Sequence, residues 1–334
     1  GSTIASLIYA SFTFIFFALE AAIMSMALQI LFGIPLSVGY VISALVVIPI
    51  VTHGIAYISR FQVWTQPIWI ILQCLPLYFV FTHNDSQLQG WLSFTGDSGQ
   101  EEGAFNLLLF GGASAVLLSL VAQIGEQVDF LRFLPEKPKK NAWRWWCALI
   151  AAGPGWIIFG ALKLFLGSFL AYLALKQGVP ANLADDPAHM YQLAYSYVFD
   201  NSDLVVIFAC VFVVISQLKI NVANAYAGSL AWSNFFSRVT HTHPGRVVWM
   251  VFNVAIALLL MELGIYQTIE SMLSVYSVVV LAWLSSVVAD LVINKPLGIS
   301  PKHIEFKRSH LYDINPVGVG SMLIASLLGF TAHF

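Results

Sequence analysis

The feature that most constrains this chain is a series of long apolar runs that recurs from one end to the other. The runs lie at about 4–31, 37–58, 64–82, 104–131, 143–175, 204–236, 247–263 and 266–293, and a ninth begins near Val317. A helix crosses a bilayer with about 20 apolar residues, and most runs reach that length. Only 10% of the residues are charged, and the mean hydropathy is +0.81, which excludes an ordinary soluble domain. We therefore predict an all-α polytopic membrane protein in which residues 1–334 form a single transmembrane domain with about eight complete helices and the start of a ninth.

The basic residues are distributed unevenly among the connections. Twelve of the 15 Lys and Arg residues fall in alternate connections. These twelve are Arg60, Arg132, Lys137, Lys139, Lys140, Arg144, Arg238, Arg246, Lys295, Lys302, Lys307 and Arg308. The opposite connections carry mainly acidic residues, namely Asp85, Asp97, Glu101, Glu102, Asp185, Asp186, Asp200 and Asp203. By the positive-inside rule, we predict a multi-pass protein of the cell (inner) membrane with its basic loops in the cytoplasm. A net charge of −2 without a basic stripe argues against nucleic acid as a partner.

Polar residues interrupt the sixth run, and they include Lys219, Asn221 and Asn224. An ammonium at the centre of a membrane costs about 2.5–3.5 kcal/mol, so it faces protein or water. At helical spacing Gln217, Asn221, Asn224 and Gly228 share one face. Two interpretations stay open: a binding site, or amides that join helices by hydrogen bonds while Lys219 snorkels or is paired structurally.

Glu20 is the single charged residue of the first run. A carboxylate without a partner in hydrocarbon takes up a proton, so Glu20 needs a cation, a donor-rich ligand or a proton-carrying role. Phe16 lies one helical turn before it, so an aromatic ring and a carboxyl group point the same way. This pair suits a flat ring with N–H groups on its edge. A structural ion pair between Glu20 and Lys219 is the alternative.

A glycine lies among polar residues near the end of the fourth run, in the order Gln123, Gly125, Glu126. Irregular backbone at membrane depth is tolerated only where it lines protein or water. We therefore predict a helix break there that lines a cavity. Asp129 and Arg132 follow at the spacing of a structural helix pair near the cytoplasmic interface. Between the fifth and sixth runs, the pattern predicts a short amphipathic helix over about 188–198.

No set of residues indicates an enzyme. Four histidines fall at irregular spacing in the cytoplasmic connections, and no nucleophile has a base beside it. The three cysteines, Cys74, Cys147 and Cys210, share no spacing typical of metal ligands. We predict that the protein is not an enzyme and that it has neither a metal site nor a cofactor.

Four segments form a recognisable series. They are Phe16–Glu20, the connection Arg60–Pro67, the Val128–Phe133 run Val-Asp-Phe-Leu-Arg-Phe, and Asn221–Gly228, which reads Asn-Val-Ala-Asn-Ala-Tyr-Ala-Gly. In motif, order and spacing the series resembles the nucleobase-cation symporter family, which includes purine and cytosine permeases and hydantoin transporters. Where that family typically has Trp-Phe-Gly-x-Gln in its third helix, this chain has Phe-Phe-Ala-Leu-Glu.

The resemblance implies a transporter fold of five-plus-five inverted repeats. The chain would correspond to the third to tenth helices of that fold, lacking the first two helices and truncated in the eleventh, as an excerpt of a longer protein. The substrate-binding residues implied by the resemblance, together with the predicted helix break, are Phe16, Glu20, Gln123, Gly125, Glu126, Asn221 and Asn224.

One departure from the family concerns the coupling ion. Sodium-coupled members have hydroxyl residues just before Asn-x-x-Asn, whereas this chain has Lys219 and Ile220. An ammonium there would supply the positive charge that sodium otherwise brings, and isoleucine cannot coordinate a cation. We therefore predict no sodium site of the usual kind, and either proton coupling through Glu20 or Lys219 or no coupling at all.

The predicted function is secondary transport of a nucleobase or a related planar N-heterocycle or ureide, of the cytosine, purine, allantoin or hydantoin class. Its partners would be this small nitrogenous substrate, a possible coupling proton and the lipid bilayer. Glu20 in place of Gln favours a substrate edge made of donors. The alternative is a transporter-like sensor module of a signalling protein, which binds a solute without pumping it.

Overall fold

The computed structural model describes residues 2–96, 105–131, 133–305, 307, 310 and 314–333. Within these residues every regular element is a helix, which confirms the all-α prediction for the described chain. Several charged residues used to predict the orientation lie outside them: Asp97, Glu101, Glu102, Arg132 and Arg308. The proposed pairing of Asp129 with Arg132 therefore stays a prediction, as does the cytoplasmic placement of the basic loops.

Six helices in the described part of the chain are long and apolar enough to cross a membrane. They are Thr3–Phe32, Ile55–His83, Leu107–Asp129, Ala142–Lys176, Ser202–Val239 and Ser271–Asn294. Two shorter apolar helical segments cover Leu36–Thr52 and Pro316–Ala332. These lengths fit a helical protein embedded in a membrane, while the inverted-repeat fold stays a prediction.

The second apolar run, 37–58, does not form one helix. It divides into α2 (Leu36–Leu45) and α3 (Val47–Thr52), and its last residues begin α4 (Ile55–His83). Pro49 explains the first interruption, because it has no N–H for the Leu45 carbonyl and its ring clashes with that group. Gly54 makes the second, with a φ of 85° that favours glycine.

The chain divides into two compact units, which we describe separately. Unit 1 contains residues 1–16, 105–128 and 226–334, and unit 2 contains residues 17–104 and 129–225. Two long helices, α1 (Ser2–Phe32) and α12 (Ser202–Val239), contribute residues to both units.

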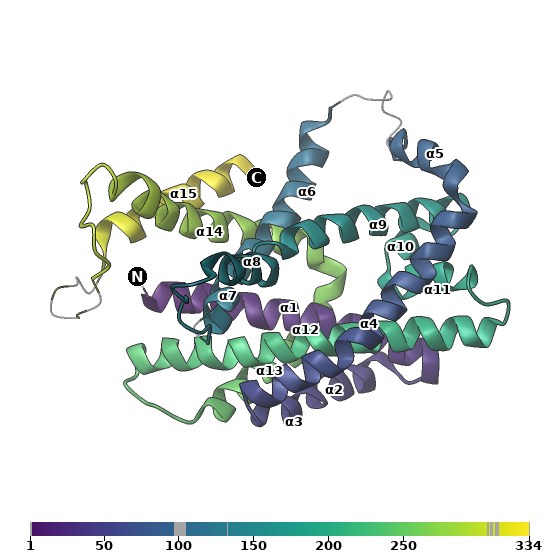
Figure 1. The fold of residues 1–334 in the computed structure, drawn as a ribbon, viewed down its shortest axis with the longest axis horizontal. Helices are drawn as coiled ribbons and strands as arrows, with labels where there is room; N and C mark the ends of the chain where they lie inside the picture. Colours follow the sequence, from purple (N-terminus) through teal and green to yellow (C-terminus); the bar gives the residue numbers. More distant parts are fainter. Residues whose placement is uncertain are drawn as a thin grey trace. The chain divides into compact units, whose positions relative to one another are not determined.

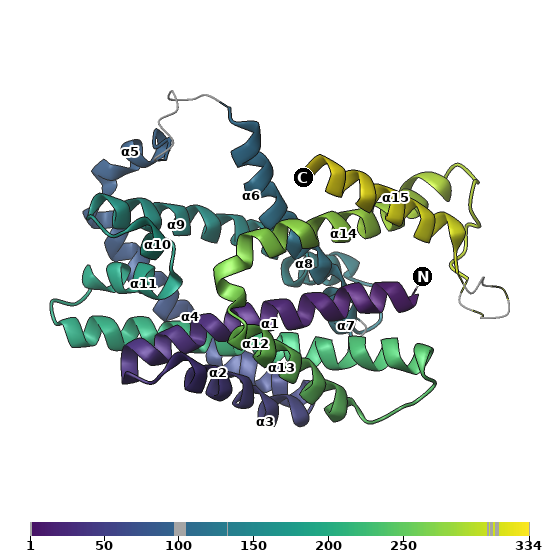
Figure 2. The same cartoon turned by 180° about the vertical axis from the view of Figure 1, so that it is seen from behind.

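In unit 1, α14 (Ile269–Ala289) packs against two other helices, α6 (Leu107–Ser119) and α15 (Pro316–His333) (Figure 2). Gly264, with a φ of 78°, makes the turn between the helix that ends at Glu262 and the short helix before α14. The remaining elements are η2 (Leu120–Gln123), α7 (Ile124–Leu131, whose last three residues belong to unit 2), α13 (Arg246–Glu262), η3 (Ile265–Thr268) and a π-helical turn η4 (Asp290–Asn294).

In unit 2, α4 crosses the first half of α12, and α11 (Pro187–Ser196) packs against both α4 and α9 (Trp156–Lys176) (Figure 1). The helix predicted at 188–198 is confirmed as α11. It begins where the Asp186 side chain accepts hydrogen bonds from the backbone of Ala188 and His189. The other elements are η1 (Asp85–Gln87), α5 (Leu88–Leu92), α8 (Ala142–Ala152) and α10 (Ala181–Ala184).

A proline inside α4 shows how unit 2 satisfies its backbone. Pro76 cannot donate to the Leu72 carbonyl one turn earlier. The buried Tyr195 hydroxyl of α11 donates to that carbonyl instead, at 2.8 Å. Prolines are tolerated in membrane helices when a neighbouring helix satisfies the freed carbonyl in this way. This contact helps to fix α11 against α4.

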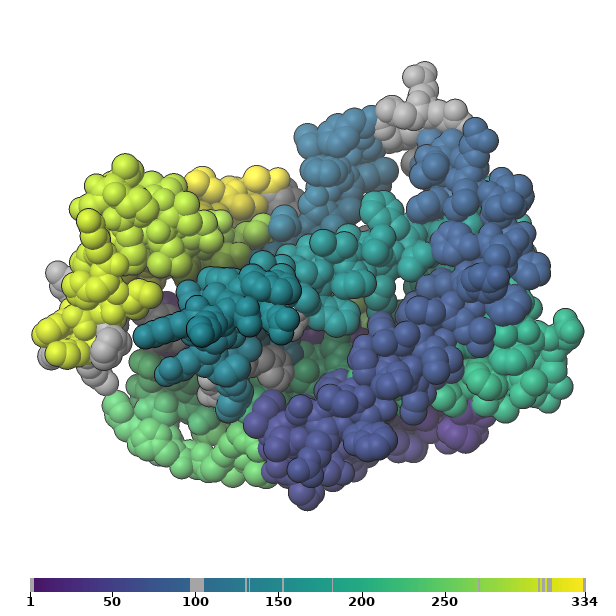
Figure 3. Space-filling view, viewed as in Figure 1, coloured from purple at the N-terminus to yellow at the C-terminus, as the bar shows by residue number. Residues whose placement is uncertain are grey.

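Two of the three tryptophans of α8 lie at the surface of unit 2. Trp143 and Trp146 are 62% and 48% exposed. The Arg144 guanidinium lies 5.4 Å from the centre of the Trp143 ring. Figure 3 shows side chains of α8, in dark teal, on the visible face. Tryptophan beside arginine is typical of the interfacial belt of a membrane protein.

Candidate functional site

The predicted site residues divide between the two units. Unit 1 holds Phe16, Gln123, Gly125 and Glu126, and unit 2 holds Glu20, Lys219, Asn221 and Asn224. The surroundings of each set are therefore described within its own unit. The strongest polar chemistry belongs to unit 2, where three charged side chains lie well inside candidate membrane spans.

Glu20, on α1, is half-buried and has two polar neighbours in unit 2. The Gln217 side chain of α12 makes a hydrogen bond with it, and the Lys163 ammonium of α9 attracts it electrostatically. Among the described residues, no ion pair of 4.0 Å or less joins Glu20 to Lys163 or to Lys219. The structural pair of Glu20 with Lys219, which the sequence left open, is thus not formed.

The second charge near Glu20 is Lys163, to which the sequence analysis gave no role. Its ammonium lies 5.3 Å from the centre of the Trp69 ring, on α4. The Trp69 Nε1–H group donates to the Ser216 hydroxyl of α12 at 2.9 Å, so the ring is held in place. We call Glu20, Trp69, Lys163, Ser216 and Gln217 the charged cluster. It joins α1, α4, α9 and α12, and the exposed Lys163 side chain leaves it open on one side.

The signal that could have identified Lys163 is present in the sequence. Lys163 interrupts the fifth apolar run as Glu20 interrupts the first, and the energetic argument is the same for both. The sequence could not show that these two charges share a cluster, because their proximity depends on how α1 and α9 pack. Trp69 carried no signal, since tryptophan is common in apolar helices.

Lys219, for which we predict the role of a substitute for the coupling cation, is hydrogen-bonded to α4. Its ammonium donates to the Thr65 hydroxyl at 2.9 Å and to the Gln62 carbonyl at 3.1 Å. In return, the Gln62 side-chain amide donates to the Lys219 carbonyl at 2.7 Å. These bonds link α12 to α4 and hold the ammonium as a fixed charge. A role of that charge in place of sodium stays a prediction.

The polar side chains of α4 continue this link toward its other end. Gln62, Thr65, Trp69 and Gln73 follow one another at intervals of three or four residues, so they share one face. The Tyr191 hydroxyl of α11 donates to Gln73 Oε1 at 2.9 Å. Burial raises the pKa of the Tyr191 phenol to about 12, so it stays protonated and can donate near neutral pH. This face of α4 thus fixes both α12 and α11.

Asn221 and Asn224 are 1% and 2% exposed. They form one long hydrogen bond, from Asn224 Nδ2 to Asn221 Oδ1 at 3.4 Å. Among the described residues, the buried Nδ2 of Asn221 has no hydrogen-bond partner. A buried amide donor left unpaired costs about 1–3 kcal/mol, so these amides have unused capacity to bind a polar group.

Two of the predicted residues of unit 1, Phe16 and Gly125, pack closely against aromatic rings. Phe16 is 8% exposed, and its ring centre lies 4.5 Å from that of Phe12. A Cβ atom on Gly125 would lie 2.8 Å from the Tyr9 ring, so close packing of Tyr9 requires the glycine. Stacking of a substrate on Phe16 would therefore require the ring to become uncovered, and this role stays a prediction.

The predicted irregularity of the fourth run is present, although it begins before the glycine. The helix changes from α to 3₁₀ over Leu120–Gln123 and returns to α at Ile124. A short 3₁₀ stretch inside a helix often marks a hinge. Gln123 ends this stretch, and Gly125 and Glu126 lie in the first turn of α7.

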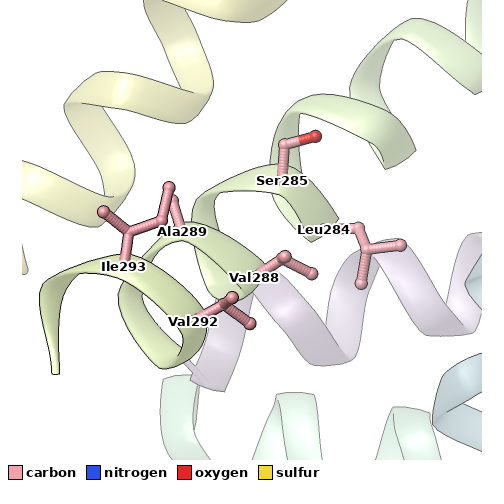
Figure 4. Close-up of a pocket in the computed structure, with 6 residues that line it drawn as sticks. All are labelled: Leu284, Ser285, Val288, Ala289, Val292 and Ile293. Carbon is pink, nitrogen blue, oxygen red and sulfur yellow. The ribbon is translucent and has the colours of Figure 1, made fainter. Parts of the chain in front are cut away.

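A shallow apolar depression lies on the surface of α14 and η4 in unit 1 (Figure 4). It is lined by Leu284, Ser285, Val288, Ala289, Val292 and Ile293. The Ser285 hydroxyl is the only polar side-chain group in this lining. A nitrogenous ring needs several donors and acceptors, so the depression does not suit it.

In comparisons with known proteins, no family model, no curated protein and no solved structure matches the chain. The resemblance to the nucleobase-cation symporters thus depends on the sequence motifs alone. The charged cluster and the buried amides provide the physical basis on which a function can be proposed.

Proposed function

We propose that this chain is the core of a secondary transporter for a nucleobase or a related planar N-heterocycle or ureide. The observation that carries the proposal is the charged cluster of unit 2, which places Glu20 and Lys163 well inside candidate membrane spans without a direct ion pair. The motif resemblance supports the substrate class. Alternating access around a midplane site, with no covalent chemistry, is the mechanism of such transporters.

The energetics of the cluster support a binding role over a purely structural one. A charged group in the middle of a membrane costs about 2.5–3.5 kcal/mol, even on insertion scales. Neutral hydrogen bonds between membrane helices contribute about 0.6 kcal/mol each on average, and they are sufficient to join helices. Two charges that are close but not paired are therefore an expensive way to hold helices together. A polar ligand that pairs with both would offset part of this cost.

In the proposed mechanism Glu20 and Asn224 bind the edge of the ring, with Asn221 nearby. The roles that the resemblance implies for Phe16, Gln123, Gly125 and Glu126, which belong to unit 1, stay predictions. Glu20 is the candidate carrier of a coupling proton. Lys219 supplies a fixed positive charge, because its ammonium already has two acceptors on α4.

A second candidate function is sensing. The bonds of Lys219 to Gln62 and Thr65 favour it, since a cation site filled by a tethered ammonium cannot exchange ions with the solvent. Such a protein would bind the same solute without pumping it. A soluble kinase-like region encoded in the same reading frame would favour the sensor.

The test uses the intact protein in liposomes. Uptake of labelled cytosine, guanine, hypoxanthine, uracil, hydantoin and allantoin is measured with a sodium gradient, with a proton gradient and with neither. We expect uptake of at least one compound, driven by protons and indifferent to sodium. Sodium-driven uptake would contradict the role given to Lys219. Binding without transport in every condition would favour the sensor, and neither binding nor transport of any compound would overturn both functions.

A further inference from the structure

The charged cluster has unused hydrogen-bonding capacity on both of its charges. Among the described residues, no acceptor takes a hydrogen bond from the Lys163 ammonium. This ammonium lies over the Trp69 ring. Glu20 has the Gln217 side chain as its hydrogen-bond partner. An ammonium has three donors and a carboxylate about four acceptor sites, so most of this capacity is free for a ligand.

The positions of the two charges are fixed by different helices. Trp69, under the Lys163 ammonium, is held by its 2.9 Å bond to Ser216, and Gln217 beside Ser216 reaches Glu20. A cation over an indole face gains about 0.5–2 kcal/mol, which favours this position of Lys163. The donor and the acceptor therefore lie in one cluster, separated by more than the 4.0 Å of an ion pair.

We propose that the cluster recognises a lactam edge, that is, an N–H group directly beside a C=O group on a planar ring. The ring N–H donates to the Glu20 carboxylate, and the neighbouring carbonyl accepts from the Lys163 ammonium. This inference rests on the proposed function and narrows it. It makes Lys163 a specificity-determining residue and replaces the donor-only edge predicted from Glu20 with an edge that carries both a donor and an acceptor.

Other ligand chemistries fit these two charges less well. A ligand with a single charge pairs with one of these side chains and is repelled by the other. A ring without the N–H, or without the C=O, leaves one of the two charges unpaired and loses a hydrogen bond to a charged group, which contributes about 1.5–3 kcal/mol. A site that hydrogen-bonds its substrate rejects analogues lacking the matching group far more strongly than an apolar pocket does.

The first test compares matched rings with the intact protein in liposomes. Hypoxanthine and uracil carry lactam edges, 1-methylhypoxanthine and 1,3-dimethyluracil lack the corresponding N–H groups, and adenine has no carbonyl. We expect uptake or binding of hypoxanthine or uracil, with at least tenfold weaker affinity for the methylated forms and for adenine. Adenine or a methylated ring bound as well as its lactam counterpart would overturn the inference while leaving the proposed function standing.

The second test changes Lys163 and uses a lysine of the same helix as a control. Lys163→Gln should weaken lactam affinity at least tenfold, while Lys163→Arg, which keeps the charge, should retain it within about threefold. Lys176, near the end of α9, also lies over an aromatic ring, 5.6 Å from the centre of Tyr172. Lys176→Gln should leave affinity within about twofold.

Folding of each variant is checked by its thermal stability in detergent, so that loss of binding is interpreted only for folded protein. If Lys163→Gln fails to fold, the Lys163→Arg variant and the matched rings still decide the question. Equal affinity of Lys163→Gln and Lys176→Gln would overturn the inference. Absence of binding by every ring in the wild-type protein would overturn the proposed function itself.

Discussion

Unit 1 and unit 2 both join apolar helices through polar side chains, but they use different chemistry. Around Asn253 and Asn234 of unit 1, the bonds that join different helices are between neutral groups. The Asn253 carbonyl oxygen accepts from the Thr13 hydroxyl and from the Trp232 indole, each at 3.0 Å, and Asn234 Nδ2 donates to Ser6 at 2.6 Å. In unit 2 the contacts include the charges of Glu20, Lys163 and Lys219.

The difference shows what helix packing requires in this molecule. Unit 1 packs α1, α12 and α13 around Asn253 without a charge at that position. The acidic residues within its spans, Glu126 and Asp290, lie close to the span ends, where the cost of a charge is lower. Charges in the middle of a span are therefore not needed for packing in unit 1, and the unpaired charges of Glu20 and Lys163 in unit 2 call for a functional explanation.

The largest effect is expected at Glu20. Glu20→Gln keeps the shape of the side chain but removes its charge. A hydrogen bond to a charged group contributes about 1.5–3 kcal/mol, so affinity for the substrate should fall by about 10- to 100-fold. The loss of affinity is measured by equilibrium binding of the substrate to the purified wild-type and variant proteins. Glu262→Gln, at the exposed end of α13, is the matched control and should change nothing. An equal loss in both variants would remove the distinction between the units.

The next effect concerns the packing of unit 1. A Cβ atom on Gly228 would lie 2.5 Å from Asn253 Cγ and Oδ1 and 2.7 Å from the Thr13 hydroxyl. Gly228→Ala should therefore destabilise the protein by about 1–3 kcal/mol, which a thermal melt in detergent would detect. Gly320→Ala, in α15, meets open space and should leave the melting temperature unchanged or slightly higher. Similar melts for the two variants would contradict the packing described around Asn253.

Two asparagines allow the comparison to be sharpened. Asn224→Ala, in unit 2, should weaken substrate affinity by about tenfold or more and change stability little. Asn253→Ala, in unit 1, should lower the melting temperature, because Trp232 and Thr13 lose their common acceptor, and should leave affinity unchanged. Substrate affinity and melting temperature are measured for both variants, and we expect each variant to change only one of the two. Unchanged uptake kinetics in Asn224→Ala would reject its assignment to the site.

The smallest effect is expected for a neutral contact at the edge of unit 1. The hydroxyls of Ser286 and Ser321 lie 3.2 Å apart between α14 and α15, in an exposed position. Ser286→Ala should lower stability by no more than about 0.6 kcal/mol, the average for polar contacts between membrane helices. A loss several times larger would show that neutral contacts carry more of the stability than unit 1 suggests.

The sequence predicted those features that local patterns determine. The apolar runs indicated a helical membrane protein, the amphipathic pattern predicted α11, and the cluster of Gln123, Gly125 and Glu126 indicated an irregular fourth run. The sequence-based prediction of one continuous helix was less accurate for the run 37–58. There Pro49 and Gly54 interrupt the helix although the run is apolar. There, single residues decide the backbone, and hydropathy does not detect them.

The partners of the polar residues could not be predicted, because they depend on contacts between distant segments. Glu20 and Lys163 are 143 positions apart, and Lys219 bonds to Thr65 across 154 positions. The sequence identified Glu20 and Lys219 as charges in need of partners, and it left a pair between them open as an alternative. The structure gives each a different partner, and Lys163 enters the site only through the packing of α9 against α4.

The most direct test of the central claim is a double-mutant cycle with Glu20→Gln, Lys163→Gln and the double variant, in which ligand affinity and ligand-free thermal stability are both measured. If the two charges act together on a bound ring, each single variant loses affinity, the losses are coupled, and ligand-free stability shows no coupling. If the charges serve only to hold α1 and α9 together, the coupling appears in the ligand-free melting temperature, and affinity for the ring is unchanged in all three variants. The first result is the one we predict, and the second would contradict the account.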